Sequence, residues 1–120
     1  MADMKTIKVN TDDLSVAENN DKSVYVHKFA VPFEFEGKTY SKLTFNFGKL
    51  TGRDALAIES ELQALGRPVV VPALSGEYLV RMAAKSCTEV IGADIFDNMP
   101  IRDFHAIHSK ARNFLLTSES

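Results

Sequence analysis

The pattern of hydrophobic and polar positions predicts a β-hairpin in the first half of the chain. From Val24 to Phe35 the larger hydrophobic residues recur at every second position, and the alternation returns from Leu43 to Phe47. A period of two places successive side chains on opposite faces of an extended strand. The sequence therefore predicts two antiparallel strands that turn around Gly37 and share one apolar face.

The register of this hairpin follows from the numbering of its apolar residues. Both strands carry them at odd positions, and directly opposed residues in an antiparallel pair have a constant sum. Matching the two apolar faces then requires a loop with an odd number of residues. A three-residue loop at residues 36–38 would place Phe29 opposite Phe45. Because Pro32 has no N–H to donate, we expect the first strand to lie at an edge or to bend there.

After the second strand the hydrophobic period becomes that of a helix. Residues 53–65 carry apolar side chains at spacings of three and four, and Thr51 is placed to cap this helix. Asp54 stands where the acidic partner of a capping box would lie. Gly66 follows the last apolar position, as expected for a helix terminus.

Two more helices are predicted in the second half of the chain. Ser75 caps a segment that we expect to remain helical to Ile91, and its apolar residues cover more than one side, which is typical of a central helix. Pro100 fits the first turn of a third helix, residues 100–116. The order strand, strand, helix, helix, helix indicates an α+β fold, with three helices packed on one face of an antiparallel hairpin.

Composition and charge limit the classes of function. The 120 residues are 45% hydrophobic and 25% charged, as in an average globular domain. We expect one domain at residues 23–116, a polar and mobile leader at residues 1–22, and a frayed tail at residues 117–120. The leader holds three lysines and five acidic residues, which leaves eleven basic and eleven acidic residues in the remainder. A near-neutral domain argues against nucleic-acid binding and favours weak self-association.

Cellular location is also constrained by the sequence. No segment approaches the roughly 18 consecutive apolar residues that a membrane-spanning helix requires. The first ten residues carry charges where the hydrophobic region of a secretion signal would lie. Cys87 is the single cysteine, so no internal disulfide is available. We therefore expect a cytoplasmic protein that does not bind membranes.

None of the chemically reactive residues has the spacing of a catalytic or metal site. His105 and His108 lie three apart on a predicted helix but lack a third ligand at fixed spacing. Asp94 and Asp97 lack the ligand pattern of a calcium loop. Cys87 falls inside the predicted second helix, where a small buried hydrophobe is its usual role. We expect no enzymatic activity, no metal and no cofactor.

Three segments, taken in order, resemble a known family. The hairpin FEFEGKTYSKLTFNF is followed at once by LTGRD, and DIFDNMPIRDFHAIHSKARNFLL follows the central helix. This arrangement resembles the tail assembly chaperones of long-tailed bacteriophages, especially those of Mu-like and P2-like myophages, over residues 27–116. The matching positions are Gly37, Asp54, Pro100, Asp103, Phe114 and Leu115.

The resemblance implies a non-catalytic function in the host bacterial cytoplasm. Such chaperones bind the tape-measure protein, keep its apolar helices from aggregating, help to bring tail-tube subunits to it, and are absent from the mature virion. The alternative is a small structural component of the tail, a tube or tail-completion protein that stays in the particle. Tube proteins are usually richer in strands than this sequence.

A partner-binding surface is predicted from the distribution of aromatic and valine residues. The rings nearest the open end of the hairpin, Phe29, Phe45 and Phe47, are expected to form the core because three apolar helices need a partner face. Rings close to the hairpin tip are expected to protrude, as is part of the valine-rich loop that follows the first helix, and exposed apolar patches mark interaction sites. The candidate partner-binding residues are Phe33, Phe35, Val69, Val70 and Val71.

Overall fold

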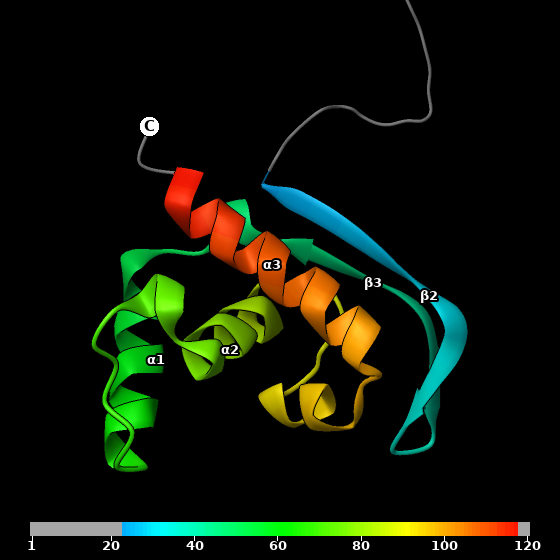
Figure 1. The fold of residues 1–120 in the computed structure, drawn as a ribbon, viewed down its shortest axis with the longest axis horizontal. Coiled ribbons are helices and arrows are strands. Elements are labelled where there is room, and N and C mark those ends of the chain that lie inside the picture. The colour runs from blue at the N-terminus through cyan, green and yellow to red at the C-terminus, as the bar shows by residue number, and fades with distance from the viewer. Residues whose placement is uncertain (1–22, 118–120) are drawn as a thin grey trace, which may run out of the picture.

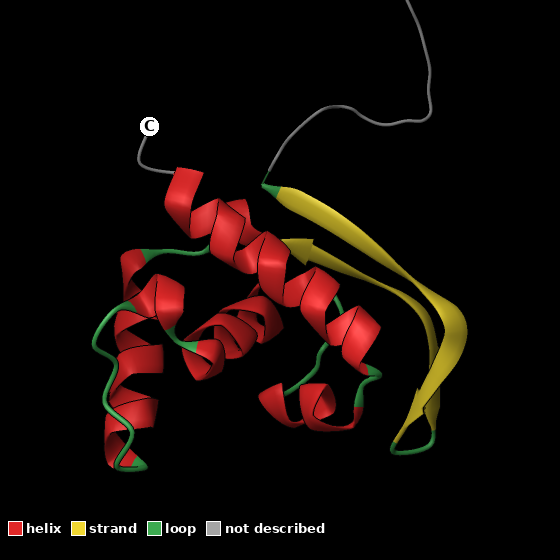
Figure 2. Ribbon diagram, viewed as in Figure 1, coloured by secondary structure: helices red, strands yellow, loops and turns green. Residues whose placement is uncertain are grey.

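A computed structural model describes residues 23–117, so the predicted leader and the last three residues lie outside the described part of the chain. The α+β architecture is confirmed (Figures 1 and 2). The elements in chain order are β2 (Val24–Phe35), β3 (Lys38–Asn46), η2 (Phe47–Lys49), α1 (Gly52–Ala64), η3 (Pro72–Leu74), α2 (Gly76–Ser86), η4 (Ala93–Asn98) and α3 (Ile101–Thr117), where η denotes a 3₁₀ helix.

The helices form two layers beside the hairpin. Figure 1 shows α3 lying along the curved hairpin, α2 in the middle of the molecule and α1 on the far side. α2 contacts β3, α1 and α3, whereas α3 contacts β2. The expectation that the second helix is central is therefore confirmed, and α1 reaches the core through α2.

The hairpin register differs from the prediction in both halves. Tyr25, not Phe29, lies opposite Phe45, and His27 lies opposite Leu43. The ladder is interrupted after the Lys28 pair, where residues 29–32 of β2 correspond to a single residue of β3. Beyond this irregularity the tip is closed by a two-residue turn, so the predicted three-residue loop was wrong.

Backbone geometry at the tip explains the shorter loop. Glu36 and Gly37 both have positive φ, 51° and 81°, which is the signature of a type I′ turn and matches the twist of the flanking strands. With this turn alone, the odd-numbered apolar residues of the two strands would lie on opposite faces of the hairpin. The three extra residues in β2 near Pro32 shift the pairing by an odd number of positions. Beyond them, toward the open end, the apolar residues of both strands share one face, and the bend expected at Pro32 lies at this shift.

The predicted ends of α1 are confirmed. The Asp54 carboxylate accepts hydrogen bonds from the Thr51 N–H at 2.8 Å and from the Thr51 hydroxyl at 3.2 Å. At the other end Gly66 has φ of 75°, and the Arg67 N–H donates to the Leu62 carbonyl at 2.8 Å. This pattern satisfies carbonyls that the last helical turn would otherwise leave unpaired.

The second helix ends earlier than the sequence predicted. Ser75 caps it by accepting from the Tyr78 N–H at 3.1 Å, but the helix ends at Ser86 rather than near Ile91. The next residues join the edge of the sheet, where Cys87 forms a bridge with Phe45 and the Thr88 N–H donates to the Thr44 carbonyl. β-Branched residues beyond this point lower the helical propensity, and the open edge of β3 provides alternative hydrogen bonds.

One hydrophobic core joins the hairpin to the helices. Phe45 and Leu43 are fully buried, and Phe47 stacks on Phe114 of α3 with ring centroids 5.5 Å apart. Their core role confirms the prediction for the rings near the open end of the hairpin, since Phe29 is also buried. Across residues 23–117 no helix has the length and apolarity needed to cross a bilayer. The other large buried residues include Ile58, Leu62, Leu79, Met82, Ile95, Phe96 and Ile107.

Candidate functional site

The hairpin tip is not the protruding aromatic surface that the sequence predicted. Phe33 is only 8% exposed, and its ring lies 5.5 Å from that of Phe29 in the core. Phe35 is half-buried. The prediction for Phe33 was wrong because the ladder irregularity bends the hairpin, and its tip curves back toward the helices (Figure 1).

A small cleft remains where the tip meets the connection between α2 and α3. It has a volume of about 180 Å³ and is lined by Phe35, Tyr40 and the residues around Ile91. Val90 at its border is fully exposed. Phe35 and Tyr40 are both half-buried against this cleft, so the tip does not present two free aromatic rings.

The valine-rich loop predicted at residues 69–72 is exposed in part. Val70 is 90% exposed and Val71 is also exposed, whereas Val69 packs partly against the core. Leu74, which the sequence analysis did not select, is 75% exposed. The Arg112 Nε–H donates to the Ala73 carbonyl at 3.1 Å and holds this loop against α3.

The two predicted halves of the partner-binding surface lie far apart. Figure 1 shows the loop that follows α1 on one side of the molecule and the hairpin tip on the other, with α2 between them. One small contact area cannot include both. Of the five candidate residues, Val70 and Val71 are the two that the structure leaves well exposed, and Val69 lies beside them.

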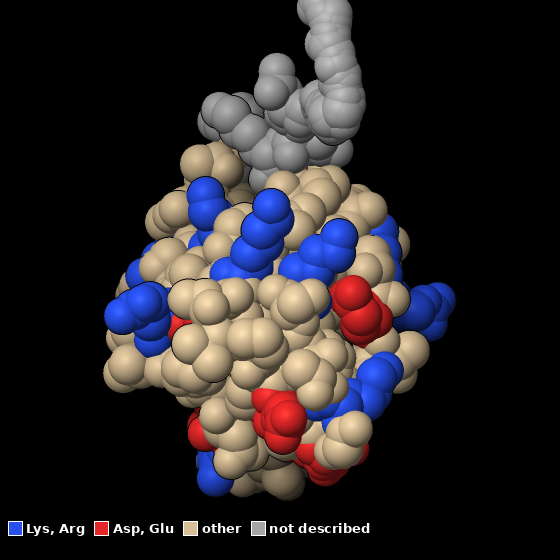
Figure 3. Space-filling view, turned by 90° about the vertical axis from the view of Figure 1, so that its right-hand side faces the viewer, with Lys and Arg blue, Asp and Glu red and all other residues tan. Residues whose placement is uncertain are grey.

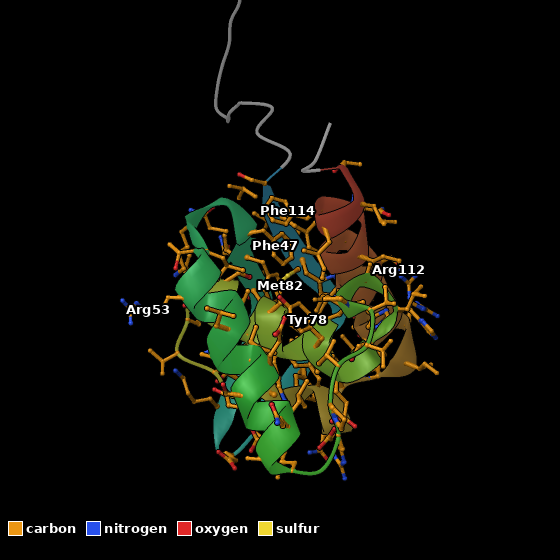
Figure 4. All side chains as sticks on the ribbon, turned by 90° about the vertical axis from the view of Figure 1, so that its left-hand side faces the viewer. Phe47, Arg53, Tyr78, Met82, Arg112 and Phe114 are labelled. Atoms are coloured by element: carbon orange, nitrogen blue, oxygen red, sulfur yellow. The ribbon has the colours of Figure 1, made fainter. Side chains whose placement is uncertain are left out.

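The side that carries this loop also has an apolar groove, which no pattern in the sequence indicated. Its volume is about 230 Å³, and its lining comes from α1, α2, the end of α3 and the chain just before α1. In Figure 4, Phe47, Met82, Tyr78 and Phe114 form a column between α1 and the helix that carries Arg112. The lining residues are Leu50, Thr51, Gly52, Asp54, Ala55, Ile58, Tyr78, Met82, Phe114 and Leu115.

Electrostatics in the groove are set by burial and by a few charges. Desolvation raises the pKa of the Tyr78 phenol, and the nearby Glu59 carboxylate adds to that effect. Because its pKa is raised, the Tyr78 phenol remains a neutral hydrogen-bond donor at physiological pH. At the α1 end of the groove, the hydrogen bond from the Thr51 backbone lowers the pKa of Asp54, with smaller contributions from Lys85 and Lys49.

A buried polar chain links β2 to α3 and was also missed by sequence reasoning. The Tyr25 hydroxyl lies 2.8 Å from His27 Nδ1, and His27 Nε2 lies 2.7 Å from Asp103 Oδ1. His27 and Asp103 are both buried although they are 76 positions apart in the chain. Desolvation and the Asp103 charge raise the Tyr25 pKa, so this phenol is not activated as a nucleophile or base. The contact ties the hairpin to the first turn of α3.

The histidines on α3 do not converge on a metal site. The His108 ring stacks on Phe104 with centroids 5.3 Å apart, and burial lowers the His108 pKa, with further contributions from Arg112 and His105. No cluster of three or more His, Cys, Asp or Glu side chains with the geometry to hold a metal occurs within residues 23–117.

Cys87 lies just beyond α2 rather than inside it, but it is buried as expected. Its Sγ lies 3.3 Å from Glu89 Oε1, and burial raises the pKa of the thiol to about 12. A thiol with such a pKa is protonated at neutral pH, whereas the thiolate is the reactive form of cysteine. The side chain therefore acts as a small buried hydrophobe.

Charges on the hairpin side of the molecule are unevenly placed. In Figure 3, several Lys and Arg side chains lie across the upper half of this face, whereas Asp and Glu lie lower, beside further Lys and Arg. Binding to a nucleic-acid backbone relies on several cations that act together along one surface. The acidic side chains on the same face offset part of this positive charge.

Comparison of the chain with protein-family models, with curated proteins and with solved structures finds no match.

Proposed function

We propose that this chain is a non-catalytic assembly chaperone of a bacteriophage tail, acting in the host cytoplasm. It binds the tape-measure protein and assists tail-tube assembly. The observation that carries the proposal is the ordered resemblance over residues 27–116: the hairpin around Gly37, the LTGRD start of α1, and the MPIRDF start of α3. Each of these motifs lies at an element boundary.

The surface of the molecule suits a function by contact. Val70 and Leu74 are large apolar side chains that remain exposed on one loop, and the apolar groove lies on the same side of the molecule. Exposed apolar patches bordered by polar residues are typical of protein interaction sites. A client protein with long apolar helices would provide apolar side chains to pack against this loop and groove.

Co-expression with the tape-measure protein of the same phage tests the proposal. The wild-type chain should raise the soluble fraction of the client, and the double variant Val70→Asp/Leu74→Asp should lose that gain without unfolding, because both side chains are exposed. Val31→Asp is the matched control, since Val31 is 74% exposed but lies on the hairpin. Phe33→Asp is unsuitable because it would place a charge in the core.

Mass spectrometry of purified virions separates the chaperone from the structural alternative. A chaperone that leaves after assembly should be absent from the particle. Detection at many copies per particle would refute the proposal in favour of a tube or tail-completion protein. Failure of the wild-type chain to raise client solubility would refute it as well.

A further inference from the structure

The first strand of the hairpin has an outer edge whose backbone groups point away from the rest of the sheet. In an antiparallel ladder, every second residue directs its N–H and C=O away from the partner strand. Thr44 of β3 does so, because its carbonyl accepts from the Thr88 N–H and its own N–H donates to the Glu89 carboxylate. Val26 lies opposite Thr44, so its backbone groups point away from β3, toward the outer side of β2.

The two residues at either side of Val26 in this alternation, Val24 and Lys28, have the same orientation. The backbone groups of these three residues form no hydrogen bond with any residue between 23 and 117. Figure 1 shows β2 at the outer margin of the molecule, and Val26 is 44% exposed. Because a strand edge with unpaired N–H and C=O groups is a template for another strand, the chemistry of this edge specifies a β-strand as its occupant.

Other parts of the hairpin edge are protected against such pairing. The outer edge of β3 is occupied at Thr44 by residues 88 and 89. Toward the tip, β2 departs from the ladder at residues 29–32 and carries Pro32, which has no N–H. Bulges and prolines are common means by which natural sheets prevent edge pairing. The free edge is therefore limited to residues 24–28, where one lysine is the only such device.

This free edge is complementary to itself. With a twofold axis at Val26, that residue pairs with the same residue of a second copy, and Val24 pairs with Lys28. All three residues then use their outward N–H and C=O groups, which gives about six hydrogen bonds. Valines meet at the centre, and no two lysines lie opposite each other. A register centred on Lys28 would place two lysines opposite each other, which is destabilising.

Net charge does not oppose the pairing of two copies. Residues 23–120 carry eleven basic and eleven acidic side chains, so long-range repulsion between copies is small. We propose that residues 24–28 of β2 pair antiparallel with the same residues of a second copy, which joins two two-stranded sheets into one continuous sheet. The contact is small, so the dissociation constant should be on the order of 10–100 µM. This dimer goes beyond the proposed function and does not depend on it.

Charge substitutions at the twofold axis test the pairing and its register, with sedimentation of the full chain as the measurement. Val26→Lys and Val26→Glu should each raise the dissociation constant at least about tenfold, because equal charges then meet across the axis. An equimolar mixture of the two variants should associate again, because opposite charges then meet. Val31→Lys is the matched control, since Val31 is exposed on the same strand but lies within the interruption. Circular dichroism checks that all three variants are folded.

Amide hydrogen exchange, followed by NMR, identifies the paired residues directly. The N–H groups of Tyr25 and His27 face β3 and should be protected at every protein concentration. The N–H groups of Val24, Val26 and Lys28 should exchange rapidly in dilute protein and become protected as the concentration rises through the dissociation constant.

The possible results each decide the proposal. A chain that stays monomeric up to millimolar concentration, a dimer that Val26→Lys does not weaken, or a mixture that does not associate again would overturn it. Protection of Val24 and Val26 that does not change with concentration would also overturn it and would indicate that residues 1–22 occupy the edge. None of these measurements depends on the tape-measure client, so the chaperone function stands or fails separately.

Discussion

Removal of the Asp103 carboxylate should destabilise the fold more than its position near a helix end suggests. In the variant Asp103→Ala, His27 Nε2 loses a partner 2.7 Å away while its side chain remains only 8% exposed. A buried polar group left without a partner costs about 1–3 kcal/mol, and a broken buried ion pair about 3–5 kcal/mol. We therefore expect a loss of about 3 kcal/mol in the free energy of unfolding. At roughly 4–8 °C per kcal/mol for a domain of this size, the melting temperature should fall by about 12–24 °C.

Urea unfolding at pH 7, followed by circular dichroism, measures this loss from the midpoint at constant slope. The double variant His27→Leu/Asp103→Leu removes both polar partners together and should be less destabilised than the sum of the two single leucine variants, because neither partner is then left unpaired. The coupling should persist in 1 M salt, since the pair is shielded from solvent. A loss below about 0.5 kcal/mol for Asp103→Ala, or strict additivity in the leucine cycle, would refute the reasoning.

Three further predictions concern the core, a helix cap and the thiol. Phe45→Ala should cost about 3–5 kcal/mol of unfolding free energy in the same urea assay, because Phe45 is fully buried; a cost below about 1 kcal/mol would contradict its position. Asp54→Ala should lower the melting temperature at pH 6. Because the folded-state pKa of Asp54 is lowered, the carboxylate stabilises the fold above its unfolded pKa, and the difference from wild type should vanish as pH falls through the folded pKa. Iodoacetamide at pH 8 should alkylate Cys87 at least about 100-fold more slowly in the native chain than in urea, since the pKa of about 12 leaves almost no thiolate; equal rates would contradict its burial.

Features that depend on local sequence were predicted well. The Thr51 and Asp54 cap, the Ser75 cap and the terminal Gly66 each involve residues within a few positions of one another. Local spacing determines such contacts, because one helical turn brings the groups together whatever the rest of the fold does. The fold class followed from the same information, since the change of hydrophobic period marks the change from strands to helices.

Features that depend on distant segments were missed. The correct hairpin register depends on two features together: the two-residue turn with positive φ at Glu36 and Gly37, and the three extra residues of β2 near Pro32. Either feature alone would place the apolar residues of the two strands on opposite faces. The early end of α2 depends on the open edge of β3, where the Thr88 N–H donates to the Thr44 carbonyl 44 positions earlier in the chain. A polar residue at a core position of a strand, His27, and another among the apolar positions of a helix, Asp103, were the available signal for the buried pair.

The candidate site was predicted only in part, for a related reason. The exposure of the valine loop could be predicted because two prolines flank three valines in a short connection between helices. The burial of Phe33 and the groove beside Tyr78 depend on how complete elements pack, which alternation along one strand does not specify. Hydrophobic pattern distinguishes the faces of an element, but it does not say which part of a face a neighbouring element covers.

The interruption of the ladder at residues 29–32 separates the hairpin into two parts with different registers. The open end packs against α2 and α3, whereas the tip is closed by its two-residue turn and held to the core by Phe33. A residue inserted or deleted in the interruption would change the local bend, whereas the same change within residues 42–46 would turn every following side chain to the opposite face. Length variation among relatives of this chain should therefore concentrate at this joint, which lets the reach of the tip evolve while the core stays constant.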